Sequence, residues 1–258
     1  MMEKQFAAAL DMRGRGNFAA ARQICRAILI ARPRHRGALN LLAELCYAAG
    51  DMIEAAELCQ RVLAFAPHDP AALAVLGEIY LDCGRLEDAI TVFRRSVAVE
   101  PGVARHHARL ATALRRAEQH DGAVESWGRA VACDDAVAWM WLEFAMFLVA
   151  LGRDAAVLDV LDAAAIAFPD EARVWWMLAD RLRAGGRAEA AAGAYQRAVS
   201  CRPRLFGAHY DFATLLAELG RTSAALEVAH RAQSLDPDHP MIGALLDRLA
   251  VTQPATGT

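Results

Sequence analysis

Four arginines between residues 105 and 116 are the residues of this chain best suited to bind an anion. Arg105 and Arg109 are four residues apart, so on a helix they lie one turn apart and point the same way. A guanidinium group matches a carboxylate or a phosphate with two parallel hydrogen bonds. The spacing therefore predicts an anion-binding surface, and a solvated charged helix face is the alternative.

Motifs for catalysis are absent from the sequence. It contains no phosphate loop, no Gly-x-Ser-x-Gly and no His-Glu-x-x-His. His106 and His107 are adjacent, so on a helix they point apart and do not form a metal pair. None of the six cysteines forms a Cys-x-x-Cys pair, and we expect them to be small packing residues. The chain is predicted to be non-enzymatic, with no cofactor and no metal.

Charge and hydropathy exclude two classes of partner. The formal net charge is −3, which gives no electrostatic case for binding nucleic acid. No stretch approaches the roughly 18 uninterrupted apolar residues of a membrane span. The first residues, Met1 to Phe6, lack the basic start and apolar middle of a secretory signal. We expect a cytoplasmic protein without membrane insertion.

A fixed period of 34 residues organises nearly the whole chain, and such a period is typical of a helical repeat array. Prolines recur with this period at Pro33, Pro67, Pro101, Pro169, Pro203 and Pro237. The one gap in the series is filled by Asp135, which like proline is a residue type that starts helices. The predicted repeats span residues 2–35, 36–69, 70–103, 104–137, 138–171, 172–205 and 206–239.

Each repeat reads as two helices of roughly 13 residues joined by a turn. Glycine follows the first helix in most repeats and can take the left-handed backbone that ends it. Small residues at repeat positions 8 and 20 let the two helices cross closely. Position 8 holds Ala9, Ala43, Gly77, Ala111, Ala145, Ala179 and Ala213. Position 20 holds Ala21, Ala55, Ala89, Ala123, Val157, Ala191 and Ala225.

The third and sixth repeats carry a set of residues at characteristic spacings. The third has Leu76, Gly77, Tyr80, Gly84, Ala89, Phe93 and Pro101; the sixth has Trp175, Leu178, Ala179, Gly186, Ala191, Tyr195, Ala198 and Pro203. These spacings resemble those of the tetratricopeptide repeat family over residues 2–239. The resemblance implies an all-α fold, a right-handed superhelical α-solenoid of antiparallel helix pairs. The first repeat departs from the pattern at Gln5 and Ala8.

The chain continues for a short distance beyond the predicted repeats. Residues 240–251 read as a capping helix, because an array needs a cover for the apolar face of its last repeat. Residues 252–258 read as a disordered tail.

The resemblance also implies that the first helix of each pair lines a concave groove that binds a partner. The residues it assigns to this groove are Asn40, Glu44, Arg105, Arg109, Arg116, Trp139, Glu143, Met146, Arg173, Trp176, Met177, Asp180 and Tyr210. They form an acidic zone, then a basic zone, then an aromatic and apolar zone. We therefore expect a protein or peptide partner with an acidic or phosphorylated segment and one large apolar residue, bound across the fourth to sixth repeats.

The carboxylate clamp of chaperone-binding members of the family is matched only in part. Arg105 and Arg109 fit its third element, whereas Asn40, Glu44 and Val75 do not fit the others. The fourth repeat is also irregular, because Glu118 stands where the other repeats have the turn glycine. We expect its turn to be rebuilt over residues 118–122, since a left-handed backbone is costly for glutamate.

Two other functions stay open. Residues 7–33 resemble the first repeat of Ala-rich arrays that precede bacterial glycosyltransferase and sulfotransferase domains. The chain could therefore be a substrate-recognition or targeting module of such a system, as a fragment or in trans. The terminal repeats could instead mediate self-association. The leading hypothesis is a scaffold that binds a peptide segment of a partner in the groove.

Overall fold

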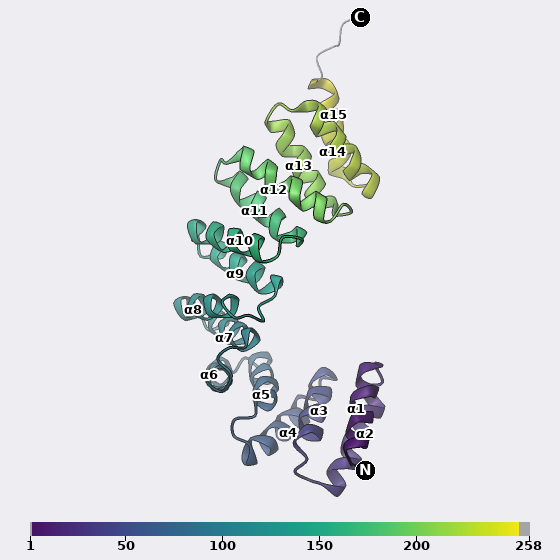
Figure 1. Cartoon of the computed structure of the whole chain (residues 1–258), viewed down its shortest axis with the longest axis vertical. Helices are drawn as coiled ribbons and strands as arrows, with labels where there is room; N and C mark the ends of the chain where they lie inside the picture. The colour runs from purple at the N-terminus through teal and green to yellow at the C-terminus, as the bar shows by residue number, and fades with distance from the viewer. Residues whose placement is uncertain (1, 253–258) are drawn as a thin grey trace, which may run out of the picture. The chain divides into compact units, whose positions relative to one another are not determined.

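A computed structural model describes residues 2–252 (Figure 1). Every regular element in this range is an α-helix, which confirms the predicted all-α class. The chain divides into two compact units, Met1–Ala136 and Val137–Thr258. The predicted disordered tail lies outside the described residues, except for Thr252, the last residue of the final helix.

The N-terminal unit consists of antiparallel helix pairs in which each helix also packs on the next one along the chain. Its helices are α1 (Met2–Gly14), α2 (Phe18–Ala31), α3 (Arg36–Ala48), α4 (Met52–Phe65), α5 (Pro70–Asp82), α6 (Leu86–Val99), α7 (Ala104–Arg116) and α8 (His120–Val131).

The C-terminal unit is built in the same way and ends in a single helix, α15, that packs on α14. Its helices are α9 (Ala138–Ala150), α10 (Asp154–Ala167), α11 (Ala172–Ala184), α12 (Ala188–Cys201), α13 (Phe206–Glu218), α14 (Thr222–Leu235) and α15 (Pro240–Thr252). The odd-numbered helices begin at the first residues of the predicted repeats, although the division into seven repeats stays a prediction.

The small residues at repeat positions 8 and 20 are fully buried. Every alanine of the two series, and Val157, has no exposed surface. Gly77 shows how close the helices come, because a Cβ atom at this residue would lie 2.4 Å from the Phe93 ring. A larger side chain at these positions would separate the helices of a pair.

Three side chains at repeat position 4 tie neighbouring repeats together. The Nε2 atom of His107 lies 2.8 Å from the Pro101 carbonyl oxygen, and the Nε1 atom of Trp175 lies 2.8 Å from the Pro169 carbonyl oxygen. His209 makes the same contact with Pro203 at 3.0 Å. The proline that precedes each of these three helices therefore supplies an acceptor for a side chain six residues later.

The turn at Glu118 is not rebuilt, so the prediction for residues 118–122 is wrong. Glu118 adopts a left-handed backbone with φ 58°, as Gly84 does in the preceding repeat with φ 72°. The backbone N–H of Gln119 donates to the Leu114 carbonyl at 2.9 Å, as that of Arg85 donates to the Tyr80 carbonyl at 2.8 Å. The shared hydrogen bonds outweigh the steric cost of Cβ, about 1–2 kcal/mol for a non-glycine residue.

Replacement of Glu118 by glycine is expected to stabilise the protein by about 0.5–1 kcal/mol. Glycine removes the left-handed strain, although its greater freedom in the unfolded chain offsets part of that gain. Urea unfolding monitored by circular dichroism measures the difference. Gly84→Ala serves as the control and should destabilise by a similar amount. An unchanged or lower midpoint for Glu118→Gly would show that this turn carries no strain.

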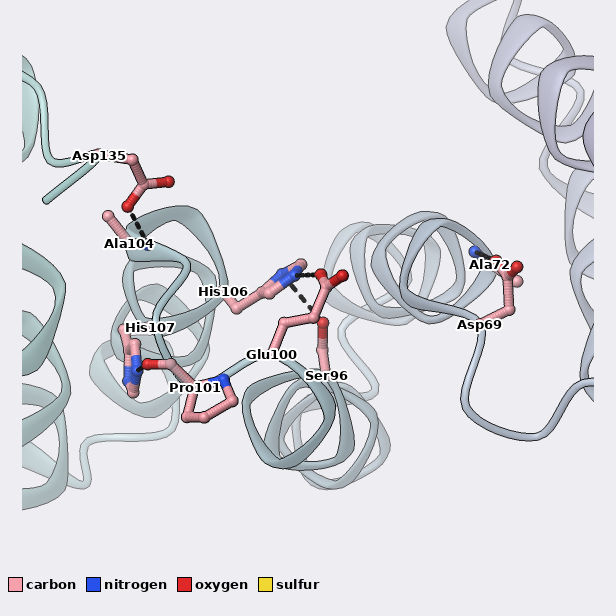
Figure 2. A network of polar contacts seen from close by, with 9 residues as sticks. All are labelled: Asp69, Ala72, Ser96, Glu100, Pro101, Ala104, His106, His107 and Asp135. Carbon is pink, nitrogen blue, oxygen red and sulfur yellow. Dashed lines mark hydrogen bonds and ion pairs between the residues drawn. The ribbon is translucent and has the colours of Figure 1, made fainter. Parts of the chain in front are cut away.

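The role of Asp135 also differs from the predicted one, because its side chain does not cap the helix that follows it. Its Oδ1 atom accepts a hydrogen bond from the Ala104 N–H at 2.8 Å, which caps α7 (Figure 2). The N-cap residue of α9 is Val137, which supplies no side-chain cap. Asp69 caps α5 through the N–H of Ala72 in the more familiar local arrangement.

No helix among residues 2–252 is long and apolar enough to cross a membrane.

Candidate functional site

A cavity of about 510 Å³ lies on the first helices of the pairs in the N-terminal unit. Phe6 of α1, Tyr47 of α3 and Glu78 of α5 line it, together with four of the predicted residues. The predicted residues are Asn40, Glu44, Arg105 and Arg109. The cavity therefore gathers most of the residues that the sequence assigned to the groove of this unit.

Acidic and basic side chains of this cavity pair with each other. The Nε atom of Arg109 lies 2.8 Å from Glu78 Oε1, and the Nη1 atom of Arg13 lies 3.0 Å from Glu44 Oε2. Burial lowers the pKa of Arg109, and the repulsion from Arg105 lowers it further, whereas Glu78 raises it. The acidic and basic zones expected from the sequence are thus largely neutralised against one another.

The other predicted residues of this unit also have internal partners. Arg116 donates from Nη1 to the Leu81 carbonyl at 3.2 Å, and Asn40 donates from Nδ2 to Asp69 Oδ1 at 2.9 Å. Arg105 is exposed, and its guanidinium makes no ion pair or hydrogen bond within residues 2–252. Of the predicted anion clamp, Arg109 is paired with a carboxylate and Arg116 uses one donor on a carbonyl oxygen, so Arg105 is the arginine whose whole guanidinium stays available for a ligand.

A second cavity, of about 420 Å³, lies between α9 and α11 of the C-terminal unit. Its wall is mainly apolar, with Leu142, Met146 and Val149 from α9 and Trp176 and Met177 from α11. Arg173, Asp180 and Arg181 supply its polar groups. We call this cavity the C-terminal pocket. Met146 is 46% exposed, so the pocket presents apolar surface to solvent.

The two arginines of the C-terminal pocket lack acidic partners among the described residues. The guanidinium groups of Arg173 and Arg181 form no ion pair there, and the Nε atom of Arg181 is buried without a hydrogen bond. Asp180, in contrast, accepts a hydrogen bond from the hydroxyl of the buried Tyr195. Burial raises the pKa of Tyr195, and the bond to Asp180 raises it further, so the hydroxyl stays protonated. The pocket therefore combines apolar walls with unpaired positive charge.

The remaining predicted residues of this unit lie outside the pocket wall. Trp139 is half-exposed, and Glu143 is partly buried on α9. The Tyr210 ring stacks on Phe206 with ring centres 6.2 Å apart. Sequence reasoning missed Val149 and Arg181. It also missed Gly207, which contacts Trp176. The signal that could have found it is the residue type, because most repeats carry a larger residue than glycine at this repeat position.

A Ser–His–Glu arrangement between α6 and α7 resembles hydrolytic chemistry. Ser96 Oγ lies 2.9 Å from His106 Nδ1, and Glu100 Oε2 lies 2.8 Å from His106 Nε2 (Figure 2). Ser96 has no exposed surface, so a substrate cannot reach its hydroxyl. These contacts fix the start of α7. His107 turns to the Pro101 carbonyl instead, so the two histidines have separate partners.

One group of potential metal ligands occurs in the described part of the chain, formed by Cys46, Asp51 and Glu54. Arginines bind both carboxylates: Arg22 contacts Asp51 at 3.1 Å and Arg26 contacts Glu54 at 2.9 Å. Burial raises the pKa of the Cys46 thiol to about 11, which disfavours the thiolate that would bind a metal. This group is an ion-pair network.

Solved structures of several repeat proteins are similar to this chain. The C-terminal part of a TPR repeat-containing protein from Cytophaga hutchinsonii has a TM-score of 0.74 at 12% identity, over 93% of this chain and 99% of that chain. A tetratricopeptide repeat protein from Parabacteroides merdae has a TM-score of 0.59 at 13% identity, over 96% and 98%. YrrB, described as a TPR protein with an unusual peptide-binding site, has a TM-score of 0.57 at 16% identity, over 75% and 99%.

Sequence comparison adds evidence that is independent of these structures. No curated protein matches the sequence. Two family models, both described as tetratricopeptide repeat, do match it. One matches residues 6–70 and 145–205, and the other matches residues 47–114. Together with the buried small residues at positions 8 and 20, these matches establish that the chain belongs to the tetratricopeptide repeat family.

Proposed function

We propose that this protein is a non-enzymatic scaffold that binds a peptide segment of a partner protein in the C-terminal pocket. One observation carries the proposal: an apolar wall lies beside two arginines that have no acidic partner in the described chain. The protein's own residues leave both features unsatisfied. A ligand with an apolar side chain next to an acidic group would satisfy both.

The chemistry of the pocket defines the expected ligand. Met146, Met177 and Leu142 are flexible apolar side chains that adapt to the shape of an anchor residue. Trp176 adds a large aromatic surface of the kind found at binding hot spots. Arg173 and Arg181 favour a carboxylate or a phosphate close to the anchor, because a charge-assisted hydrogen bond contributes about 1.5–3 kcal/mol. The proposed ligand is an acidic or phosphorylated peptide with one large apolar residue.

The N-terminal unit supports binding less directly. Its cavity is larger, but the charges of Arg109 and Glu78 already satisfy one another. Arg105 is the one predicted groove cation of this unit without an ion pair or hydrogen bond in residues 2–136. We propose that Arg105 gives this unit a weaker contact of its own with an acidic segment, separate from the C-terminal pocket. The peptide-binding site for which the similar YrrB structure is described is compatible with this class of function.

A displayed library of random dodecapeptides tests the proposal. We expect the wild-type protein to enrich peptides in which an acidic residue lies within two positions of Leu, Met, Phe or Trp. Met146→Glu should enrich none of them, because it places a charge on the apolar wall. Met241→Glu is the matched control, since Met241 is 52% exposed in the same unit and lies outside the pocket.

Two results would contradict the proposal. The first is that the wild-type protein enriches no sequence class. The second is that Met146→Glu enriches the same peptides as the wild type. Both methionines are exposed enough to accept a charge, so we expect both variants to stay folded. Circular dichroism at 222 nm checks that their helix content equals that of the wild type.

A further inference from the structure

Two residues of α13 hold the indole of Trp176 in one position. A Cβ atom at Gly207 would lie 2.6 Å from Trp176 Cη2 and 2.8 Å from Cζ2, so the ring lies directly against the glycine backbone. The Nε1–H group of the same indole donates to Asp211 Oδ2 at 2.9 Å. The glycine supplies the space for the ring and the aspartate fixes its orientation.

Asp211 occupies a site that is unfavourable for a carboxylate. Its side chain is partly buried, and this burial raises its pKa. The negative charge of Asp180 raises the pKa further, whereas the hydrogen bond from Trp176 lowers it. An ionised Asp211 thus costs stability at neutral pH, and the hydrogen bond to Trp176 offsets part of that cost. The structural role of Asp211 is therefore to hold the indole of Trp176 through this hydrogen bond.

The N-terminal unit repeats the contact between the ring and the glycine at the same repeat positions, but the residue equivalent to Asp211 is Leu41. The Phe6 ring lies against Gly37, where a Cβ atom would be 2.7 Å from Cζ, and Phe6 lines the cavity of its own unit. Among the seven predicted repeats, glycine stands at position 2 only at Gly37 and Gly207. In both cases the preceding repeat has a large aromatic residue at position 5 that lines a cavity. In both units, therefore, the contact between ring and glycine occurs beside a cavity.

We infer that Gly207 and Asp211 determine which side chain the C-terminal pocket accepts as an anchor. This inference rests on the proposed function. With glycine at residue 207 the indole lies back against α13 and leaves room for a large apolar side chain beside Met146 and Met177. A larger residue there would push the indole into the pocket that it lines. Because both contacts fix the ring before a ligand arrives, binding does not have to order it.

Three variants test the inference with the same peptide library. Gly207→Ala should shift the selected anchor from Leu, Met, Phe or Trp to Val or Ala, and should bind the peptide selected by the wild type at least fivefold more weakly. Asp211→Ala should also weaken that peptide at least fivefold. Asp211→Asn should stay within twofold of the wild type, because its amide oxygen can accept the same bond. Titration calorimetry measures all three.

A spectroscopic readout separates positioning from a loss of stability. In ¹⁵N-labelled protein, Trp176→Phe identifies the indole Nε1–H resonance of Trp176 by its disappearance. We expect this resonance to move in Asp211→Ala and to stay near its wild-type position in Asp211→Asn. A merely structural role would change the unfolding midpoint of both variants and leave their affinities for the peptide alike.

The outcomes distinguish the inference from the proposed function. If Trp176→Ala loses the peptide while Gly207→Ala and Asp211→Ala keep its affinity and its anchor preference, the inference is wrong and the proposed function stands. If Trp176→Ala binds as tightly as the wild type, the proposed function is wrong. The Asp211 pair decides the inference if Gly207→Ala does not fold.

Discussion

Replacement of Ala179 by leucine is expected to lower the free energy of unfolding by about 1–3 kcal/mol. Ala179 is fully buried at repeat position 8, where every repeat carries a small residue and where the paired helices cross closely. The extra side chain would force the helices apart or take a strained rotamer. Denaturant unfolding followed by circular dichroism measures the change in midpoint.

A matched control shows whether the loss comes from packing. Ala190→Leu introduces the same side chain on α12, at an exposed residue, and should leave the midpoint nearly unchanged. Equal midpoints for Ala179→Leu and the wild type would contradict the packing role of position 8. Destabilisation by Ala190→Leu of the same size would contradict the assignment of the exposed helix face.

Neutralisation of both pocket arginines is expected to weaken peptide binding at least tenfold, or about 1.4 kcal/mol. In Arg173→Gln with Arg181→Gln, an acidic ligand loses two charge-assisted contacts. The remaining affinity should depend less on salt, because screening acts on the charges that were removed. Calorimetric titrations with a library-selected peptide at two salt concentrations measure both effects.

Arg202→Gln with Arg204→Gln is the control for this double variant. It removes the same net charge from the same unit, at exposed residues outside the pocket. If this control weakens binding as much as the pocket variant, the effect comes from net charge and not from a site. An unchanged affinity of the pocket variant would show that the two arginines form only a solvated surface.

The repeated features of the fold could be predicted from the sequence because each depends on contacts within one repeat. Ala43 and Ala179 recur at a fixed position, and a buried helix crossing tolerates only small residues there. Glu118 was the exception. A sequence rule penalised its left-handed backbone, but the hydrogen bond from Gln119 to Leu114 imposes the same turn that glycine allows elsewhere.

The site was less predictable because its side chains form ion pairs and hydrogen bonds with residues of neighbouring repeats. Arg109 pairs with Glu78, 31 residues earlier, and Asp135 caps α7, 31 residues earlier. Both contacts depend on which faces of helices from different repeats lie opposite each other, and the spacing of residues within one helix does not determine this. Trp176 and Met177 were assigned to the groove from their repeat positions, and both line the C-terminal pocket.

Methyl resonances of the methionines test most directly whether a peptide occupies the pocket between α9 and α11. In protein labelled with ¹³C at the methionine ε-methyl groups, titration with a library-selected peptide should shift Met146 and Met177. Met12 and Met52, which belong to the N-terminal unit, serve as internal references and should move little. Shifts confined to Met12 and Met52, with Met146 and Met177 unchanged at saturation, would contradict the account.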